Sequence, residues 1–184
     1  MDFAVLDFIR DNLSCGFMDI LMKTATALVD NGLIWILTAF ILICIPQTRR
    51  HAPAYFAALA VTFLLANYGI KLLVSRDRPF ILNPDIIPII VPPDGFSFPS
   101  SHTAVSFACA TVLVSVKRVI GIGALVFAAL VGLSRMYLYV HFPSDVLAGT
   151  ILGILLGLLA VRVCNLIARR REEAKKAADV SADE

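Results

Sequence analysis

Two histidines and one aspartate in the second half of the chain are the residues best suited to chemistry. His141 and Asp145 lie four residues apart, and Pro143 between them suits the first position of a helix, because proline has no N–H to leave unsatisfied. An aspartate that accepts from Nδ1–H would fix the tautomer and leave Nε2 as a nucleophile. His102 remains to protonate a leaving oxygen, since an imidazole suits general acid catalysis at neutral pH.

Basic and hydroxyl side chains occur at the same ends of the apolar segments as these histidines. They are Lys71, Arg76, Arg78, Ser100, Ser101, Ser134 and Arg135. Lysine and arginine bind phosphoryl oxygens and offset the charge of a phosphoryl-transfer transition state. No acidic cluster suited to Mg²⁺ accompanies them, and these cations would repel a zinc ion held by the histidines and Asp145. The sequence therefore favours phosphoryl transfer with a side chain as nucleophile, and we expect no metal and no cofactor.

The composition indicates where these residues must be held. Of 184 residues, 59% are hydrophobic and 16% charged, against about 45–50% and about 25% in ordinary soluble domains. The net charge of +2 gives no reason to expect nucleic acid as a partner, and the four scattered cysteines exclude a disulfide scaffold. We expect a single membrane domain over residues 1–184.

Six apolar segments can be drawn as membrane-spanning helices. They cover residues 17–29, 31–48, 52–70, 103–116, 119–134 and 146–161. A bilayer core needs about 20 apolar residues per helix, so the shorter segments must borrow polar residues at the interface. Residues 52–70 lack the polar face of a soluble helix, and the alternation of a membrane strand is absent. The sequence predicts an all-α fold, a bundle of six transmembrane helices.

Two further segments flank or interrupt this bundle. Residues 1–13 resemble no cleaved signal peptide and predict a short amphipathic helix at the interface, whose apolar positions are Phe3, Val5, Leu6, Phe8, Ile9 and Leu13. Six of the nine prolines fall within residues 76–100, which predicts one long extracytoplasmic loop.

The charges between the spans predict the orientation. Arg49 and Arg50, Lys117 and Arg118, and the basic residues after position 168 all fall on one side of a six-span bundle. The positive-inside rule then places both termini in the cytoplasm and the polar side chains at the opposite, extracytoplasmic side of the cell (cytoplasmic or inner) membrane. We expect the tail, residues 169–184, to be a frayed cytoplasmic extension.

Three blocks of these residues resemble the signature of the type 2 phosphatidic acid phosphatase (PAP2) superfamily, which includes vanadium-dependent haloperoxidases and bacterial undecaprenyl pyrophosphate phosphatases. The blocks are Lys71 with Arg78-Pro79, then Pro99-Ser100-Ser101-His102, then Ser134-Arg135 with His141 and Asp145. The resemblance implies that His141 forms a phosphohistidine, that Asp145 orients it and that His102 is the acid. It further implies phosphoryl contacts from Lys71, Arg78, Ser100, Arg135 and the backbone N–H of Ser101, where many members have glycine.

Two features outside the blocks carry weaker expectations. We interpret Arg76 as a peripheral contact to a lipid headgroup. Small-residue stripes at Gly149, Gly153 and Gly157 and at Ala124, Ala128 and Gly132 predict that the last two spans pack together, with a homodimer seam as the alternative. The chain could therefore act as a monomer or a homodimer.

The sequence thus predicts an integral membrane lipid phosphatase whose partners are lipid phosphates and membrane lipids. The favoured reaction converts undecaprenyl pyrophosphate to undecaprenyl phosphate and phosphate. Phosphatidylglycerophosphate, phosphatidic acid and diacylglycerol pyrophosphate remain alternative substrates. A non-catalytic lipid-phosphate binder or transporter is the alternative from another class.

Overall fold

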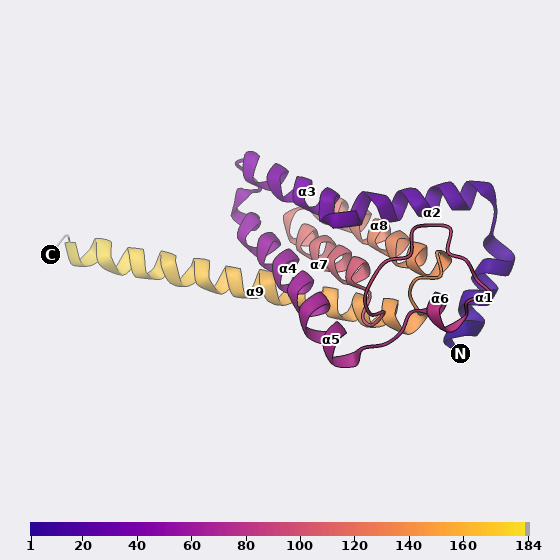
Figure 1. Ribbon diagram of the computed structural model, residues 1–184. Coiled ribbons are helices and arrows are strands. Elements are labelled where there is room, and N and C mark those ends of the chain that lie inside the picture. The colour runs from indigo at the N-terminus through magenta and orange to yellow at the C-terminus, as the bar shows by residue number, and fades with distance from the viewer. Residues whose placement is uncertain (183–184) are drawn as a thin grey trace.

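The computed structural model describes residues 1–182, and every regular element in that range is helical, as predicted (Figure 1). The α-helices are α1 (Asp2–Leu13), α2 (Gly16–Val29), α3 (Leu33–Cys44), α4 (Ala52–Leu64), α5 (Lys71–Val74), α6 (Pro79–Leu82), α7 (Ser101–Val116), α8 (Arg118–Tyr137) and α9 (Pro143–Ala182). Short 3-10 turns cover Asp30–Gly32 and Arg49–His51, and a π-helical turn, Leu65–Ile70, joins α4 to α5.

Four helical segments are long and apolar enough to cross a bilayer. They are Gly16–Cys44, Arg49–Leu82, Arg118–Tyr137 and Pro143–Lys175, and the shorter apolar helix Ser101–Val116 accompanies them. Large apolar side chains remain exposed along these helices, as lipid contact requires; Phe40 on α3 and Val126 on α8 are examples. The chain is therefore a helical membrane protein.

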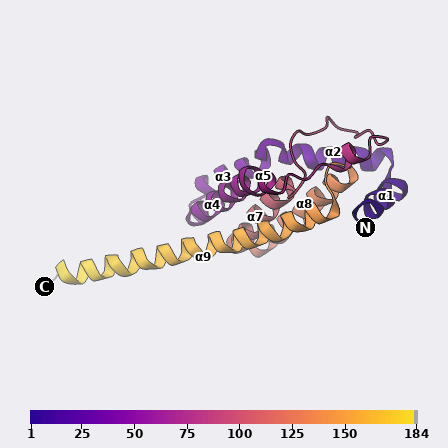
Figure 2. The same ribbon diagram turned by 60° about the horizontal axis from the view of Figure 1, so that its bottom comes forward.

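The count of six spans is not confirmed, because the first two predicted spans form one segment of 29 residues. Helices α2 and α3 run one after the other in the same direction (Figures 1 and 2). Asn31 (φ 55°) and Gly32 (φ 72°) interrupt the helix between them in left-handed conformations. The turn bends the chain without reversing it.

This arrangement also changes where the chain ends lie. The N-terminus and the far end of α9 lie at opposite ends of the bundle (Figures 1 and 2). The expectation that both termini lie in the cytoplasm stays a prediction, and this placement of the chain ends does not favour it. Helix α9 continues through Ala182, so the tail predicted to be frayed is helical over its described part. Asp183 and Glu184 lie outside the described residues.

Helix α7 is the centre of the bundle, packed against α4, α8 and α9. The glycine stripe of α9 faces α7: a Cβ on Gly149 would lie 2.6 Å from the Ser100 carbonyl oxygen, and one on Gly153 would lie 2.2 Å from that of Ala104. The glycine stripe of α9 therefore packs on α7 rather than on α8, whereas Gly132 of the second stripe faces α9: a Cβ there would lie 3.0 Å from Val146 Cγ1. The α9 stripe is therefore covered within the chain, and the oligomeric state stays a prediction.

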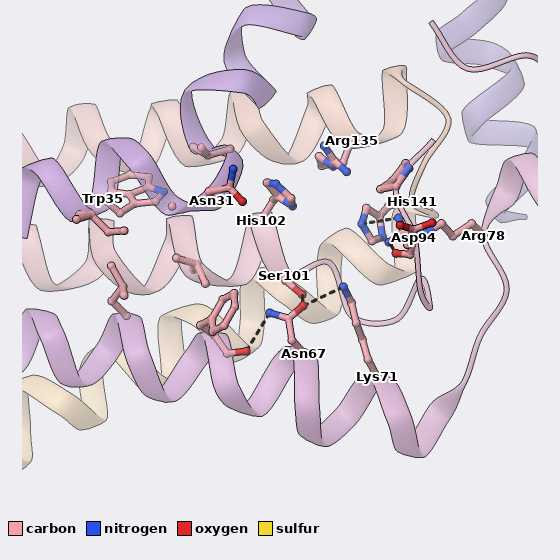
Figure 3. A pocket seen from close by; sticks show the side chains of 17 residues that line it. Asn31, Trp35, Asn67, Lys71, Arg78, Asp94, Ser101, His102, Arg135 and His141 are labelled. Carbon is pink, nitrogen blue, oxygen red and sulfur yellow. Dashed lines mark hydrogen bonds between the residues drawn. The ribbon is translucent and has the colours of Figure 1, made fainter. Parts of the chain in front are cut away.

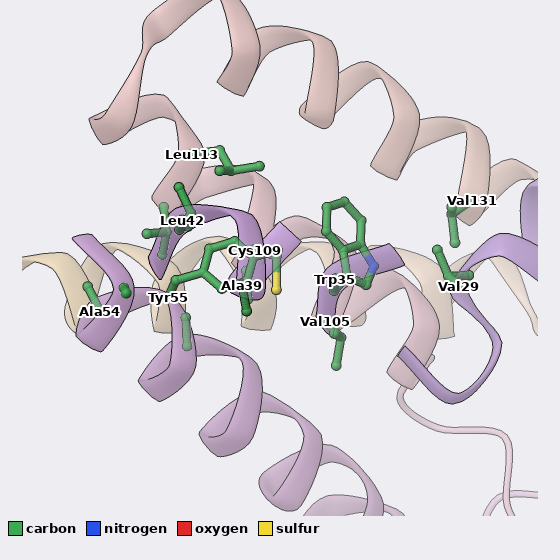
Figure 4. Close-up of a cluster of buried hydrophobic side chains, with 14 residues drawn as sticks. Val29, Trp35, Ala39, Leu42, Ala54, Tyr55, Val105, Cys109, Leu113 and Val131 are labelled. Atoms are coloured by element: carbon green, nitrogen blue, oxygen red, sulfur yellow. The ribbon is translucent and has the colours of Figure 1, made fainter. Parts of the chain in front are cut away.

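A cluster of buried side chains fills the space between α3, α4, α7 and α8 (Figure 4). Trp35 and Tyr55 are its largest members, and the Trp35 Nε1–H donates to Ser106 Oγ at 3.1 Å. Lipid tails are as apolar as these side chains, so close packing and such polar bonds, rather than escape from water, hold the helices together.

Helix α1 packs against α8 and α9 at the end of the bundle that carries the three polar blocks. Leu6 and Ile9 are its buried side chains, and the ring of Phe3 meets that of Phe142 edge-on at 5.2 Å. The predicted N-terminal helix is confirmed. Between α6 and α7, residues 83–100 form turns without a helix, and they return the chain to the start of α7.

Candidate active site

Six of the predicted site residues line a single cavity of about 450 Å³ (Figure 3). They are Lys71, Arg78, Ser101, His102, Arg135 and His141. Each comes from the end of a helix or from a turn beside one, and the cavity's remaining walls include apolar side chains of α3 and α4. Ser100 and Asp145 are buried behind this lining.

His141 and Asp145 form a buried pair at the turn that leads into α9. Pro143 begins that helix, as predicted, and this brings Asp145 Oδ2 to 3.6 Å from His141 Nδ1. The Phe142 N–H donates to the same oxygen at 2.8 Å. The Ser97 hydroxyl also donates to this oxygen, and Ser97 Oγ lies 3.4 Å from His141 Nδ1. Ser97 was missed at the sequence level, and it joins the carboxylate to the imidazole.

The surroundings of His141 keep its imidazole neutral. Burial lowers its pKa well below the usual value, and Arg135 and Arg78 lower it further, against the opposing effect of Asp145. Because Nδ1 faces the carboxylate, the proton is assigned to Nδ1 and the lone pair to Nε2. Arg78 Nη1 lies 3.4 Å from Nε2, which therefore faces the cavity.

The guanidinium of Arg78 is fixed by the backbone. Its Nε donates to the Gly95 carbonyl at 2.8 Å, its Nη2 to the Asp94 carbonyl at 3.0 Å, and its Nη1 to the Val140 carbonyl at 3.1 Å. Two of these carbonyl acceptors belong to residues 83–100, the segment before α7, so this segment holds the Arg78 side chain in place. A group held in this way needs little reorganisation when an anion binds.

Arg135 is buried in the last turn of α8. Its Nη1 donates to the hydroxyl of Thr26 on α2, and its Nε has no hydrogen-bond partner within the described residues. A buried donor without a partner costs about 1–3 kcal/mol. Arg135 also lines the cavity, where its guanidinium adds a positive charge.

Lys71 and Ser101 share a partner that the sequence interpretation missed. The Lys71 ammonium donates to Asn67 Oδ1 at 3.2 Å, and the Ser101 hydroxyl donates to the same oxygen at 2.8 Å (Figure 3). Asn67 lies in the π-helical turn before Lys71, a type of turn that is frequent at functional sites. A glycine at position 101 could not make this hydrogen bond, so the Ser101 side chain adds a contact to the site.

Ser100 is buried behind the cavity lining, and its predicted phosphoryl contact stays a prediction. Its hydroxyl accepts from Thr103 Oγ1 at 2.9 Å, and its backbone N–H donates to the Asp145 carbonyl at 3.1 Å. It therefore ties α7 to α9 behind the cavity. The amides of the first turn of α7, which begins at Ser101, are the anion donors that the fold supplies there.

His102 lies at the rim of the cavity. Its Nε2 is 3.0 Å from Asp30 Oδ1, and their side chains are 28% and 54% exposed. Asp30 belongs to the turn between α2 and α3, and its contact with a predicted catalytic histidine was not anticipated.

Arg76 is bound to carboxylates within the chain, and its side chain remains 31% exposed, so the predicted headgroup contact stays a prediction. Its Nη1 donates to Asp145 Oδ1 at 2.7 Å, its Nη2 to Asp2 Oδ2 at 2.9 Å, and its guanidinium lies over the Phe142 ring at 3.9 Å. Spacing along the chain placed it between Lys71 and Arg78 but could not give its direction. Arg76 compensates the buried charge of Asp145.

The cavity lies inside a bundle of apolar helices. It is lined by an oriented imidazole, a second histidine and three cations. These features define the class: a membrane protein with a site suited to binding a phosphoryl group. The PAP2 superfamily profile matches residues 52–168 of the chain. The chain belongs to this superfamily.

Several characterised proteins are similar to it. Undecaprenyl-diphosphatase BcrC of Bacillus subtilis is 31% identical over 121 residues, which are 66% of this chain and 62% of that protein. The crystal structure of Aquifex aeolicus LpxE superposes with a TM-score of 0.78 at 26% identity, over 88% of this chain and 94% of that one. The crystal structure of a PAP2-type phosphatidylglycerolphosphate phosphatase from Bacillus subtilis superposes with a TM-score of 0.67 at 27% identity. The superposition covers 90% of this chain and 85% of that one. The chain spans a little over three fifths of the length of the first of these relatives.

Proposed function

We propose that the protein is an integral membrane phosphatase that hydrolyses a lipid phosphate or lipid pyrophosphate without a metal ion. The observation that carries the proposal is the position of His141, whose Nδ1 faces Asp145 and Ser97 while its Nε2 faces Arg78 and the cavity. Membership of the PAP2 superfamily supports the same chemistry.

The reaction runs as a double displacement. The Nε2 lone pair of His141 attacks phosphorus, the bond from phosphorus to the leaving oxygen breaks, and His102 gives that oxygen a proton. Water then attacks the phosphohistidine, the N–P bond breaks, and His102 accepts a proton from that water. Lys71, Arg78 and Arg135 hold the phosphoryl oxygens, together with the first amides of α7, and Asp145 stabilises the charge that develops on His141.

Undecaprenyl pyrophosphate is the substrate we favour. One similar protein is named an undecaprenyl-diphosphatase, and the cavity wall between α3 and α4 is apolar, with Trp35, Ile36, Leu59 and Phe63 available to a lipid chain. Phosphatidylglycerophosphate is the alternative that a structural relative supports. A panel of these two lipids with phosphatidic acid and diacylglycerol pyrophosphate, compared by kcat/KM, distinguishes the substrates.

Release of phosphate by the purified protein, in detergent with a chelator, tests the activity itself. His141→Ala should abolish release, and His51→Ala should leave it unchanged, because His51 lies in the 3-10 turn before α4, outside the cavity. Equal turnover by His141→Ala would remove the proposed nucleophile. Binding of lipid phosphate without turnover by the wild type would favour the non-catalytic binder.

The orientation we propose keeps the positive-inside rule and revises the span count. The basic residues Arg49, Arg50, Lys117 and Arg118 lie at the helix ends remote from the cavity, and that end faces the cytoplasm. The chain then crosses five times, with α2 and α3 as one broken span, the site outside and α1 at the outer interface of the cytoplasmic membrane.

Cysteine labelling tests this orientation. In a chain lacking Cys44, Cys109 and Cys164, the exposed Cys15 should react with an impermeant maleimide on intact cells. A cysteine introduced as Ala174→Cys should react only after the cells are permeabilised. If neither cysteine reacted with the maleimide in intact cells, both termini would be cytoplasmic and the proposed orientation would be wrong.

A further inference from the structure

Helix α2 reaches the site through two polar side chains that lie one helical turn apart. Thr26 accepts a hydrogen bond from Arg135, and Asp30, at the end of the helix, contacts His102. Both positions precede residue 52, where the match to the family profile begins. The segment that supplies these contacts therefore lies outside the part of the chain that carries the three blocks.

Asp30 reaches the site because the helix is broken between α2 and α3, directly after this residue. Asn31 and Gly32 both take left-handed conformations, so the apolar helix is interrupted directly after Asp30. Both residues of the break line the cavity. A non-glycine residue in this conformation is uncommon and costs free energy, so the break is a built feature of the cavity wall.

The positive charges around the cavity make a carboxylate beside His102 important for the protonation of His102. Three cations, Lys71, Arg78 and Arg135, share the cavity with His102, and each opposes the positive charge that an imidazole must carry before it can donate a proton. Asp30 Oδ1 lies 3.0 Å from His102 Nε2 and offsets that repulsion. With Nε2 engaged by the carboxylate, Nδ1 is the nitrogen left for the leaving group.

We propose that Asp30 is a positioning residue for His102, which it orients, and whose protonated form it favours, through the 3.0 Å contact at the helix break. The two histidines of the site then each have a carboxylate partner, Asp145 for the nucleophile and Asp30 for the acid. This inference rests on the proposed function, in which His102 protonates the leaving oxygen.

The experiment compares two phosphate monoesters that differ in their need for an acid. Dodecyl phosphate must expel an alkoxide, which requires a proton, whereas 4-nitrophenyl phosphate expels a phenolate that is stable without one. Asp30→Asn should lower kcat/KM for dodecyl phosphate at least about tenfold more than for 4-nitrophenyl phosphate, since general acid catalysis is worth about 10²–10⁴-fold. The ratio kcat/KM reports the step in which the leaving group departs.

Two variants act as comparisons for this result. Thr26→Val removes the partner of Arg135, which binds phosphoryl oxygens, so it should lower kcat/KM for both esters by the same factor. Asp11→Asn, an exposed acidic position on α1, should change neither. Unfolding temperatures in detergent identify any variant that simply fails to fold.

A double-mutant cycle with His102→Ala completes the test. If Asp30 acts through His102, Asp30→Asn should cause no further loss for dodecyl phosphate once His102 is alanine. Equal losses for both esters, or additive losses in the cycle, would overturn the inference while the wild type still released phosphate. A wild type that releases no phosphate from either ester or from a lipid phosphate would instead refute the proposed function.

Discussion

Arg76 Nη1 lies 2.7 Å from Oδ1 of Asp145, the oxygen that does not face His141. The two carboxylate oxygens thus have separate partners, since Ser97 and the Phe142 N–H bind Oδ2. Arg76 itself is held by Asp2, so α1 is connected to the catalytic pair through one guanidinium.

Replacing Arg76 should impair catalysis although it does not line the cavity. Arg76→Ala leaves the buried Asp145 with less compensation, and we expect kcat to fall about 10- to 100-fold, the range typical when an outer partner of a catalytic group is removed. Asp2→Ala should cost less, because Arg76 keeps its bond to Asp145. Arg10→Ala on the exposed side of α1 is the control, and an unchanged kcat in Arg76→Ala would refute this role.

Ser97 should affect turnover more than substrate binding. Ser97→Ala removes one donor from Asp145 Oδ2, and a buried acceptor that loses a partner costs about 1–3 kcal/mol. We expect kcat to fall about tenfold with KM nearly constant, because Ser97 does not line the cavity. Ser115→Ala, at the other end of α7, serves as the control. A rise in KM at constant kcat would place Ser97 in substrate binding instead.

The lowered pKa of His141 predicts how the nucleophile titrates. Its imidazole is neutral in the folded protein at pH 6.5, where an unperturbed histidine is half protonated. The unfolded chain binds more protons there, so this group's contribution to stability decreases as the pH falls below about 6.5. In histidine-labelled protein, the NMR signal that His141→Ala removes should stay at its neutral position as the pH falls through 6.5. A midpoint at or above 6.5 would contradict the burial argument.

The glycine stripe of α9 provides a test of the packing. A Cβ at Gly153 would lie 2.2 Å from the Ala104 carbonyl oxygen, so Gly153→Ala must push α9 away from α7. We expect a loss of about 1–3 kcal/mol, measured as a lower unfolding temperature in detergent. Gly123→Ala on α8 is the matched control, because nothing lies within 4 Å of its added Cβ. Equal unfolding temperatures for the two variants would show that α9 packs elsewhere.

The candidate site could be assembled from the sequence to the extent that its residues lie at the ends of apolar helices. Lys71, Ser101, His102, Arg135 and His141 all line the cavity, as their places beside hydrophobic segments suggested. Asn67 could have been found too, since it precedes Lys71 by one turn on the same helical segment. Thr26, Asp30 and Ser97 could not, because no local pattern distinguishes them from ordinary polar residues.

Two determinations belong to the sequence alone. The apolar runs predict a helical membrane protein, since only internally bonded backbone can cross hydrocarbon. The three blocks predict the phosphatase family, since residue types and short spacings are local properties. Tertiary packing decided the rest. It made α2 and α3 one broken span, turned Arg76 toward Asp145, and brought Thr26 to Arg135 across 109 residues of chain. The direction of a side chain and its distant partners depend on how helices pack, and a linear pattern does not contain that information.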